Sequence, residues 1–275
     1  MLSKSGTTAT VEATRSADGT TIGWERVGSG PPLVVLHGGM RAGKHYRALA
    51  DAMAHRYSVV LVDRRGRGHS GPGRDDDGVE TEVADLAAVL AATGADRVFG
   101  HSAGACISLE AAHRLRIREL ALYEPPVEPL PFDWLPAFEA ALARGKTARA
   151  LSLAIAGLEM GPRGVPAWVM TLVARVLLHT ATGKEATALV RLLSRDVATV
   201  RSVQGRLERH AALPGSCRTL LLDGSASPAY LRRAVDALAS IIPGAARTTL
   251  ARQSHNAPDM DAPVPVATEL LSFYS

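Results

Sequence analysis

The sequence predicts an α/β protein whose central, mostly parallel β-sheet is flanked by helices. Short apolar runs, such as residues 33–36 and 57–62, alternate with stretches that have helical spacing. A continuous apolar run is typical of a strand covered on both faces, and its alternation with helices predicts a parallel sheet. The pentapeptide Gly100-His101-Ser102-Ala103-Gly104 fits G-x-S-x-G and lies between a strand-like run and an Ala-rich run. This pattern is typical of a sharp strand-to-helix turn.

The first half of the chain is expected to follow this alternation throughout. Residues 8–15 and 20–27 alternate in polarity as two strands, and residues 17–19 form their hairpin turn. The run at 33–36 ends in a glycine pair, which allows close approach of the backbone to a ligand. The remaining elements are expected at residues 45–55 (helix), 57–62 (strand), 80–92 (helix), 96–99 (strand), 105–115 (helix) and 117–123 (strand).

The alternation of strands and helices stops after Pro125-Pro126, which end the strand at 117–123. Helical runs broken by glycine and proline are expected at residues 135–143, 147–158, 167–179, 185–196 and 197–210. Strands at 217–222 and 246–250 and helices at 228–242 and 264–273 then restore the alternation. We therefore expect a core of residues 1–126 and 213–275 with a helical insertion at 127–212. Six apolar residues of the insertion are candidates for facing a pocket: Trp134, Phe138, Met160, Trp168, Met170 and Leu172. We expect most of them to lie in the core of the insertion instead, because apolar residues at helical spacing usually do.

The loop Asp63-Arg64-Arg65-Gly66-Arg67-Gly68-His69-Ser70 is polar and rich in glycine. It lacks the spacing of a P-loop and that motif's Lys-Ser/Thr ending. We expect a structural turn whose arginines pair with local carbonyl groups.

Composition and charge exclude several classes of protein. The net charge of +4 comes from scattered arginines, and no basic block is interleaved with aromatic residues, which makes nucleic acid an improbable partner. Cys106 and Cys217 lie far apart, so we expect buried apolar residues rather than a disulfide or a metal site. No apolar leader segment or membrane-length stretch is present. We expect a cytoplasmic protein with a small-molecule substrate, no cofactor and no nucleic-acid or membrane partner, and the sequence is compatible with a homo-oligomer.

Ser102 is the candidate nucleophile. A strained turn would expose its hydroxyl at a helix N-terminus, beside backbone N–H groups that can hold an oxyanion. A serine hydroxyl needs a base within hydrogen-bond reach, and histidine suits this role because its pKa lies near neutral pH.

Four markers in this order resemble the α/β-hydrolase superfamily. They are His37-Gly38-Gly39, the loop 63–70, the pentapeptide around Ser102 and the late His255, and the resemblance covers residues 20–122 and 218–273. It implies an α/β-hydrolase fold with the nucleophile after the fifth strand and with residues 127–212 as a helical cap. It also implies His255 as the general base, and an oxyanion hole from the N–H groups of Ala103 and of Gly39 or Met40.

The acid of the triad departs from the family pattern. The family usually has Gly, two residues and Asp after the strand at 217–222, but this chain has Gly224-Ser225-Ala226-Ser227. Glu124, at the end of the preceding strand, is the preferred substitute, because some families carry their acid there. Asp223 is the alternative acid, and a dyad completed by Ser227 or water is the third interpretation.

These residues favour a serine hydrolase that cleaves a small-molecule ester, thioester or lactone through an acyl-enzyme intermediate. The family's dehalogenases and epoxide hydrolases need a carboxylate nucleophile, which Ser102 cannot supply. The family's aminopeptidases continue the His-Gly-Gly motif with Pro-Gly, where this chain has Met40-Arg41. The displaced acid leaves one enzymatic alternative, a non-hydrolytic lyase or cyclase of a biosynthetic pathway that uses the same serine and histidine. A binding protein without turnover is the third hypothesis.

Overall fold

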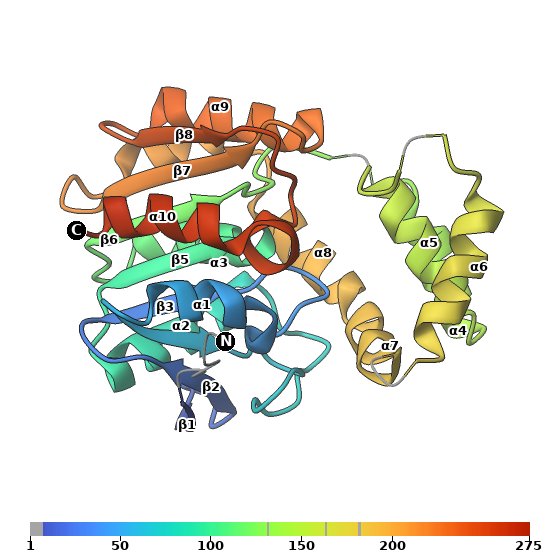
Figure 1. Ribbon diagram of the computed structural model, residues 1–275, viewed down its shortest axis with the longest axis horizontal. Helices are drawn as coiled ribbons and strands as arrows, with labels where there is room; N and C mark the ends of the chain where they lie inside the picture. Colours follow the sequence, from blue (N-terminus) through green and yellow to red (C-terminus); the bar gives the residue numbers. More distant parts are fainter. Residues whose placement is uncertain (1–7, 131, 163, 181–182) are drawn as a thin grey trace, which may run out of the picture.

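A computed structural model describes residues 8–130, 132–162, 164–180 and 183–275 of the chain. Its centre is an eight-stranded sheet with the strand order β1-β2-β4-β3-β5-β6-β7-β8 (Figure 1). The strands are β1 Ala9–Arg15, β2 Thr21–Val27, β3 Pro32–Leu36, β4 Ser58–Val62, β5 Arg97–His101, β6 Glu119–Tyr123, β7 Arg218–Gly224 and β8 Ala246–Leu250.

The strands β3 to β8 are parallel, whereas β1 and β2 form an antiparallel hairpin whose second strand pairs with β4. The turn is as expected, since Ser16 N–H donates to Thr20 O at 2.8 Å across residues 17–19. The sheet and its flanking helices confirm the predicted fold class.

Helices cover both faces of the sheet because successive side chains of each strand point to opposite faces. Val34 and Leu36 of β3 pack into a core with α2 Val79–Thr93, α3 Ala103–Ala112 and α9 Ala229–Ile241. Leu33 and Val35 pack on the other side with α1 Arg47–Met53 and α10 Pro263–Phe273. The apolar runs are therefore buried on both faces of the sheet, as the sequence predicts for parallel strands.

A helical insertion, here α4 to α8, separates β6 from β7 and projects from one end of the sheet (Figure 1). It consists of α4 Leu135–Ala143, α5 Thr147–Gly157, α6 Ala167–Leu178, α7 Gly183–Arg191 and α8 Leu193–Val203. Phe138, Ala154 and Val190 belong to a small core of its own. Cys106 and Cys217 are buried and unpaired, as expected.

The predicted helix boundary between residues 196 and 197 is wrong. Asp196 and Val197 lie inside α8, and the helix begins after Leu192. The predicted helix 197–210 is also interrupted, because Gly205 has φ +71° and a short 3₁₀ helix, Leu207–Ala212, follows it. Within the described ranges, no helix has both the length and the hydropathy that crossing a membrane requires.

Candidate active site

Ser102 occupies a strained turn between β5 and α3. Its backbone has φ 54° and ψ −119°, a conformation that non-glycine residues rarely adopt. The flanking glycines permit this turn: a Cβ atom would lie 2.6 Å from Ala105 Cα at Gly100 and 2.2 Å from Leu36 O at Gly104. The sequence therefore places Ser102 at the tip of the turn by removing the side chains that would collide there.

The loop that follows β3 places backbone N–H groups near Ser102. Gly38 N–H donates to the Tyr46 hydroxyl at 3.2 Å, and Met40 N–H donates to Asp196 Oδ2 at 3.2 Å. Gly39 lies between these two anchored residues, and its N–H has no acceptor among the residues that the structure describes. Ala103 N–H begins α3 and has no acceptor within the helix. Gly39 and Ala103 line the same cavity as Ser102, whereas the Met40 donor is already engaged.

Neutral histidines hold this loop in place. Burial lowers the pKa of both His37 and His101 well below the usual value, so both rings are neutral at pH 7. His37 Nε2 accepts Arg64 N–H at 3.1 Å, which leaves Nδ1–H to donate to Gly38 O at 2.8 Å. His101 Nδ1 lies 2.5 Å from the Tyr46 hydroxyl, which also accepts Gly38 N–H. Gly38 is thus held on both sides of its Cα atom, through its N–H and through its carbonyl group.

Glu124 reaches His255 from the end of β6. The Glu124 side chain is fully buried, and its Oε2 lies 2.5 Å from His255 Nδ1. Its Oε1 accepts Gly224 N–H at 2.7 Å, so β7 fixes the carboxylate from the opposite side. The Glu124 backbone has φ +48°, a second strained position beside Ser102. This geometry meets the distance expected of a carboxylate that orients a catalytic histidine.

The other two candidates for the acid's place have different partners. Asp223 is the penultimate residue of β7, accepts a hydrogen bond from the Thr249 hydroxyl at 2.7 Å and faces Arg247 at 3.5 Å. Ser227 Oγ is buried and has no hydrogen-bond partner in the described part of the chain. Neither residue has a hydrogen bond to His255 among the described residues, where the Nδ1 position is held by Glu124.

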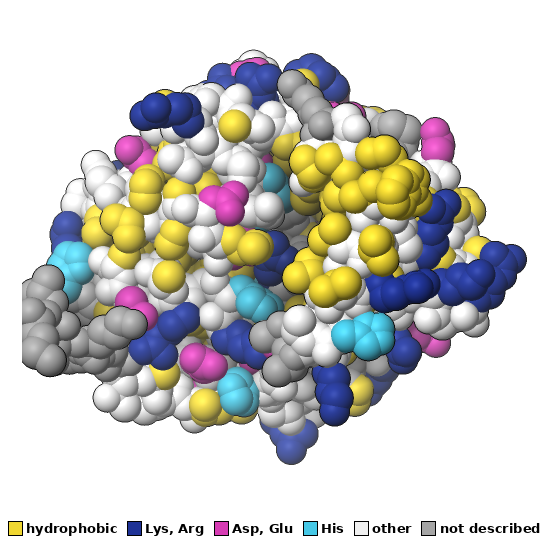
Figure 2. All heavy atoms as spheres, turned by 45° about the vertical axis from the view of Figure 1, so that its right-hand side comes forward, with side chains coloured by type: hydrophobic (Ala, Val, Ile, Leu, Met, Phe, Trp, Pro, Cys, Tyr) yellow, Lys and Arg dark blue, Asp and Glu magenta, His cyan; other side chains and the backbone are white. Residues whose placement is uncertain are grey.

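Ser102 and His255 line one cavity between the core and the helical insertion, where the molecular surface is hollowed (Figure 2). Besides Ser102 and the histidines, the polar or charged residues that line the cavity are Arg41, Asp196, Tyr230 and Asn256. Its remaining walls are largely apolar, with Met40, Pro126, Leu130, Phe132, Leu158, Met160, Leu193, Val197, Val200 and Leu231. An acyl group bound against Ser102 would therefore lie among aliphatic side chains.

Of the six residues predicted as candidates for facing a pocket, Met160 lines this cavity. Phe138 lies in the core of the insertion, with Trp134 packed against it. Trp168 and Leu172 correct the prediction, because their exposed fractions are 68% and 54%. Helical spacing identifies the apolar face of a helix but does not show what covers that face.

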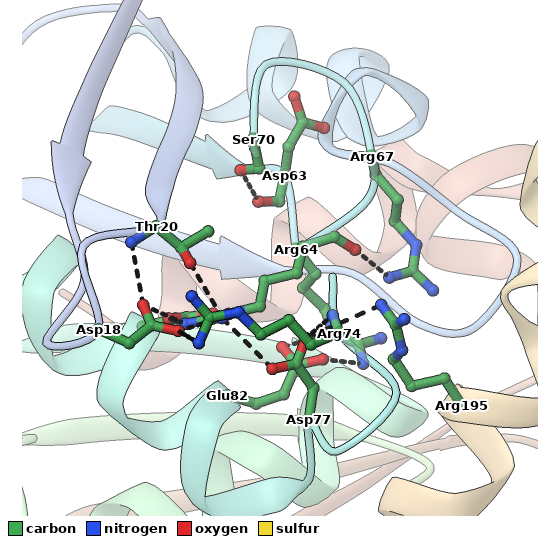
Figure 3. Close-up of polar contacts among 12 residues, drawn as sticks. Asp18, Thr20, Asp63, Arg64, Arg67, Ser70, Arg74, Asp77, Glu82 and Arg195 are labelled. Atoms are coloured by element: carbon green, nitrogen blue, oxygen red, sulfur yellow. Dashed lines mark hydrogen bonds and ion pairs between the residues drawn. The ribbon is translucent and has the colours of Figure 1, made fainter. Parts of the chain in front are cut away.

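The arginines of the loop 63–70 also correct the prediction of pairing with local carbonyl groups. Arg64 donates to Glu82 at 2.6 and 3.1 Å (Figure 3), and Arg65 donates to Asp85 at 2.6 and 2.7 Å. Of these three arginines, Arg67 alone donates to a local carbonyl group among the described residues, at 3.1 Å to Arg65 O. All three arginines are buried, and a buried cation requires a nearby anion.

Asp196 is the residue of this site that the sequence does not reveal. Its carboxylate lies 2.7 Å from Arg67 Nη2 and 3.0 Å from Arg64 Nη1, and it packs against Gly39. It thus joins α8 of the insertion to the loop 63–70 and to the loop that follows β3. An acidic residue in a helical run normally indicates a solvated face, so no sequence pattern points to it.

The fold and the arrangement around Ser102 define an α/β hydrolase. Residues 33–269 match the α/β hydrolase family, and the chain belongs to it. Among solved structures, an α/β hydrolase from Sphaerobacter thermophilus DSM 20745 is 34% identical with a TM-score of 0.80, over 96% of this chain and all of that one. The enol-lactonase from Burkholderia xenovorans LB400 has a TM-score of 0.70 over 96% of this chain and 99% of its own; at 19% identity, it shows the shared fold.

A curated relative, N-formylmaleamate deformylase from Pseudomonas putida, is 33% identical over 105 residues. The match covers 36% of this chain and 39% of the deformylase, so it spans about two fifths of that relative's length.

Proposed function

We propose that this protein is a serine hydrolase that cleaves a small-molecule ester, thioester or lactone through an acyl-enzyme on Ser102. The observation that carries the proposal is the 2.5 Å contact between His255 Nδ1 and Glu124 Oε2, beside the cavity that Ser102 and His255 share. An imidazole held in this way has its Nε2 available as a base, and a buried carboxylate stabilises the imidazolium that forms.

The reaction begins when His255 Nε2 removes the proton of Ser102 as Oγ attacks the substrate carbonyl carbon. The carbonyl oxygen becomes an oxyanion and accepts hydrogen bonds from the N–H groups of Gly39 and Ala103. The bond to the leaving group then breaks, and the His255 imidazolium returns the proton to that group. His255 then deprotonates a water molecule that attacks the acyl carbon. The bond from that carbon to Ser102 Oγ breaks, Oγ takes the proton back from His255, and the acid is released.

Several observations favour this reaction over a lyase or cyclase. The lyase or cyclase alternative rests on the absence of an acid at residue 227. Glu124 at the end of the neighbouring strand weakens this argument, because its carboxylate contacts His255 Nδ1 in place of the missing acid. The apolar walls of the cavity suit an uncharged acyl group. The activities named for two similar proteins, a deformylase and an enol-lactonase, are consistent with hydrolysis of an acyl bond.

Ser102→Ala tests the proposal directly. A fluorophosphonate probe should label the wild-type protein, which should also turn over p-nitrophenyl butyrate. The variant should lose labelling and turnover and keep its circular dichroism spectrum, because alanine is smaller than serine at the same turn. Labelling of the wild type without turnover of any ester would favour the non-hydrolytic alternative, and neither would favour a binding protein.

The anchoring of the loop that follows β3, which contains Gly38 and Gly39, leads to another prediction. Tyr46→Phe removes the hydroxyl that links Gly38 N–H to His101. Each lost hydrogen bond removes about 1 kcal/mol of the free energy that holds the loop in place. We expect kcat for p-nitrophenyl butyrate to fall about fivefold or more with little change in KM. Tyr57→Phe is the matched control, since its buried hydroxyl donates to Tyr274 O at 2.5 Å, away from the cavity. A similar loss of kcat in both variants would contradict a role for Tyr46 in positioning the loop.

A further inference from the structure

The helix α6 exposes a broad apolar face to solvent. Trp168, Leu172 and Val176 follow one another at four-residue intervals, with exposed fractions of 68%, 54% and 63%. Val173 and Leu177 widen the face, at 46% and 58%. The opposite side of α6 contains the buried Ala174 and packs against α5. Figure 2 shows apolar side chains gathered over the insertion, with lysine and arginine side chains beside them.

Basic side chains border this outer face of α6. Lys146, Arg149, Arg175 and His179 line a groove between α6 and the start of α5, and no carboxylate lines it with them. Lys146, Arg149 and Arg175 are exposed, and none forms an ion pair with another residue in the part of the chain that the structure describes. The border of the apolar face therefore carries basic side chains that have no ion-pair partner among the described residues.

We propose that the outer face of α6 docks on a membrane surface that contains anionic lipids. The exposed face of α6 carries a tryptophan and branched aliphatic residues, and Arg175 of α6 and Lys146 and Arg149 at the start of α5 lie at its edge. An apolar helix face bordered by basic side chains resembles those that lie in the membrane interface. Its apolar side chains would leave water for the acyl boundary, and each nearby Lys or Arg gains attraction to anionic head groups. Such docking needs no membrane-spanning segment, but it departs from the sequence-based expectation that the protein has no membrane partner.

The charge distribution favours this occupant over a second copy of the chain. Pairing two copies of α6 face to face and antiparallel would place each Arg175 edge against the same edge of the other copy. These like charges would repel, whereas an anionic bilayer supplies the opposite charge. The cavity at Ser102 is also largely apolar, so a lipid surface would present substrates that partition out of water.

Vesicle flotation of the full chain tests the proposal. The protein should float with vesicles of phosphatidylcholine mixed with phosphatidylglycerol and much less with phosphatidylcholine alone. Leu172→Ser/Val176→Ser should weaken partitioning at least tenfold. Arg149→Gln/Arg175→Gln should weaken it on the mixed vesicles about fivefold per arginine and change little on phosphatidylcholine. Trp168 emission should shift to the blue on the mixed vesicles, and Trp168→Phe should remove this shift.

Val11→Ser and Val264→Ser are matched controls, because their exposed fractions of 59% and 61% resemble those on α6 but they lie on β1 and α10. Both should bind vesicles as the wild type does. Absence of flotation with the mixed vesicles, or flotation that Leu172→Ser/Val176→Ser leaves unchanged, would overturn the proposal. A dimer in analytical ultracentrifugation that this double variant dissociates, without vesicle binding, would assign the face to a second copy.

Discussion

Replacing Glu124 by glutamine should lower kcat by about three to four orders of magnitude while the fold is retained. Glutamine keeps the length and nearly the shape of the side chain but carries no charge to stabilise a His255 imidazolium. Its amide nitrogen could also face His255 Nδ1 in place of Oε2, which would favour the tautomer with the proton on Nε2 and block the base. Steady-state turnover of p-nitrophenyl butyrate and circular dichroism measure the two parts of this expectation.

Asp223→Asn is the matched control for Glu124→Gln. Asp223 is equally buried and lies on the neighbouring strand, but its hydrogen bond runs to Thr249 and not to His255. Its substitution should therefore change kcat far less than that of Glu124. If Asp223→Asn abolished turnover while Glu124→Gln preserved it, the assignment of the orienting carboxylate would be wrong.

The sequence predicts the fold class well because the elements of the core are local signals bounded by strong breakers. The strand β8 and the helix α4 begin and end at the predicted residues, 246–250 and 135–143. Pro243-Gly244 precedes the first and Arg144-Gly145 follows the second, so composition alone sets these limits. The contact between Glu124 and His255 is predictable for another reason, since the missing acid at Ser227 leaves few carboxylates near the ends of the central strands.

The remaining features depend on contacts between residues far apart in the sequence. Arg64 and Arg67 form ion pairs with Asp196, which lies more than 120 residues further along the chain, and neither periodicity nor spacing indicates that pairing. The same contact explains the misplaced helix boundary, because a charged residue facing inward looks like a break in an apolar pattern. The exposure of Trp168 is likewise a property of how α6 is placed, which its sequence does not encode locally.

The second large effect is expected at Asp196, whose carboxylate joins the helical insertion to the core. Burial lowers the pKa of the Arg67 guanidinium, while the charge of Asp196 acts in the opposite direction, so the pair compensates a costly buried cation. Asp196→Leu leaves Arg67 without its ion-pair partner and leaves Arg64 with Glu82 alone. We expect the free energy of unfolding to fall by about 3–5 kcal/mol, measured by urea denaturation.

A surface pair and a double variant separate this effect from a general loss of helix stability. Glu185→Leu breaks the exposed pair with Lys44 and should cost less than about 1 kcal/mol. Arg67→Met/Asp196→Leu removes both charges together and keeps the Arg64–Glu82 pair, so it should recover most of the stability that Asp196→Leu loses. Because Met40 N–H loses its acceptor in both Asp196 variants, kcat should stay low even where stability returns. Equal losses of stability in the single and double variants would show that the carboxylate acts through packing and not as the counter-ion of Arg67.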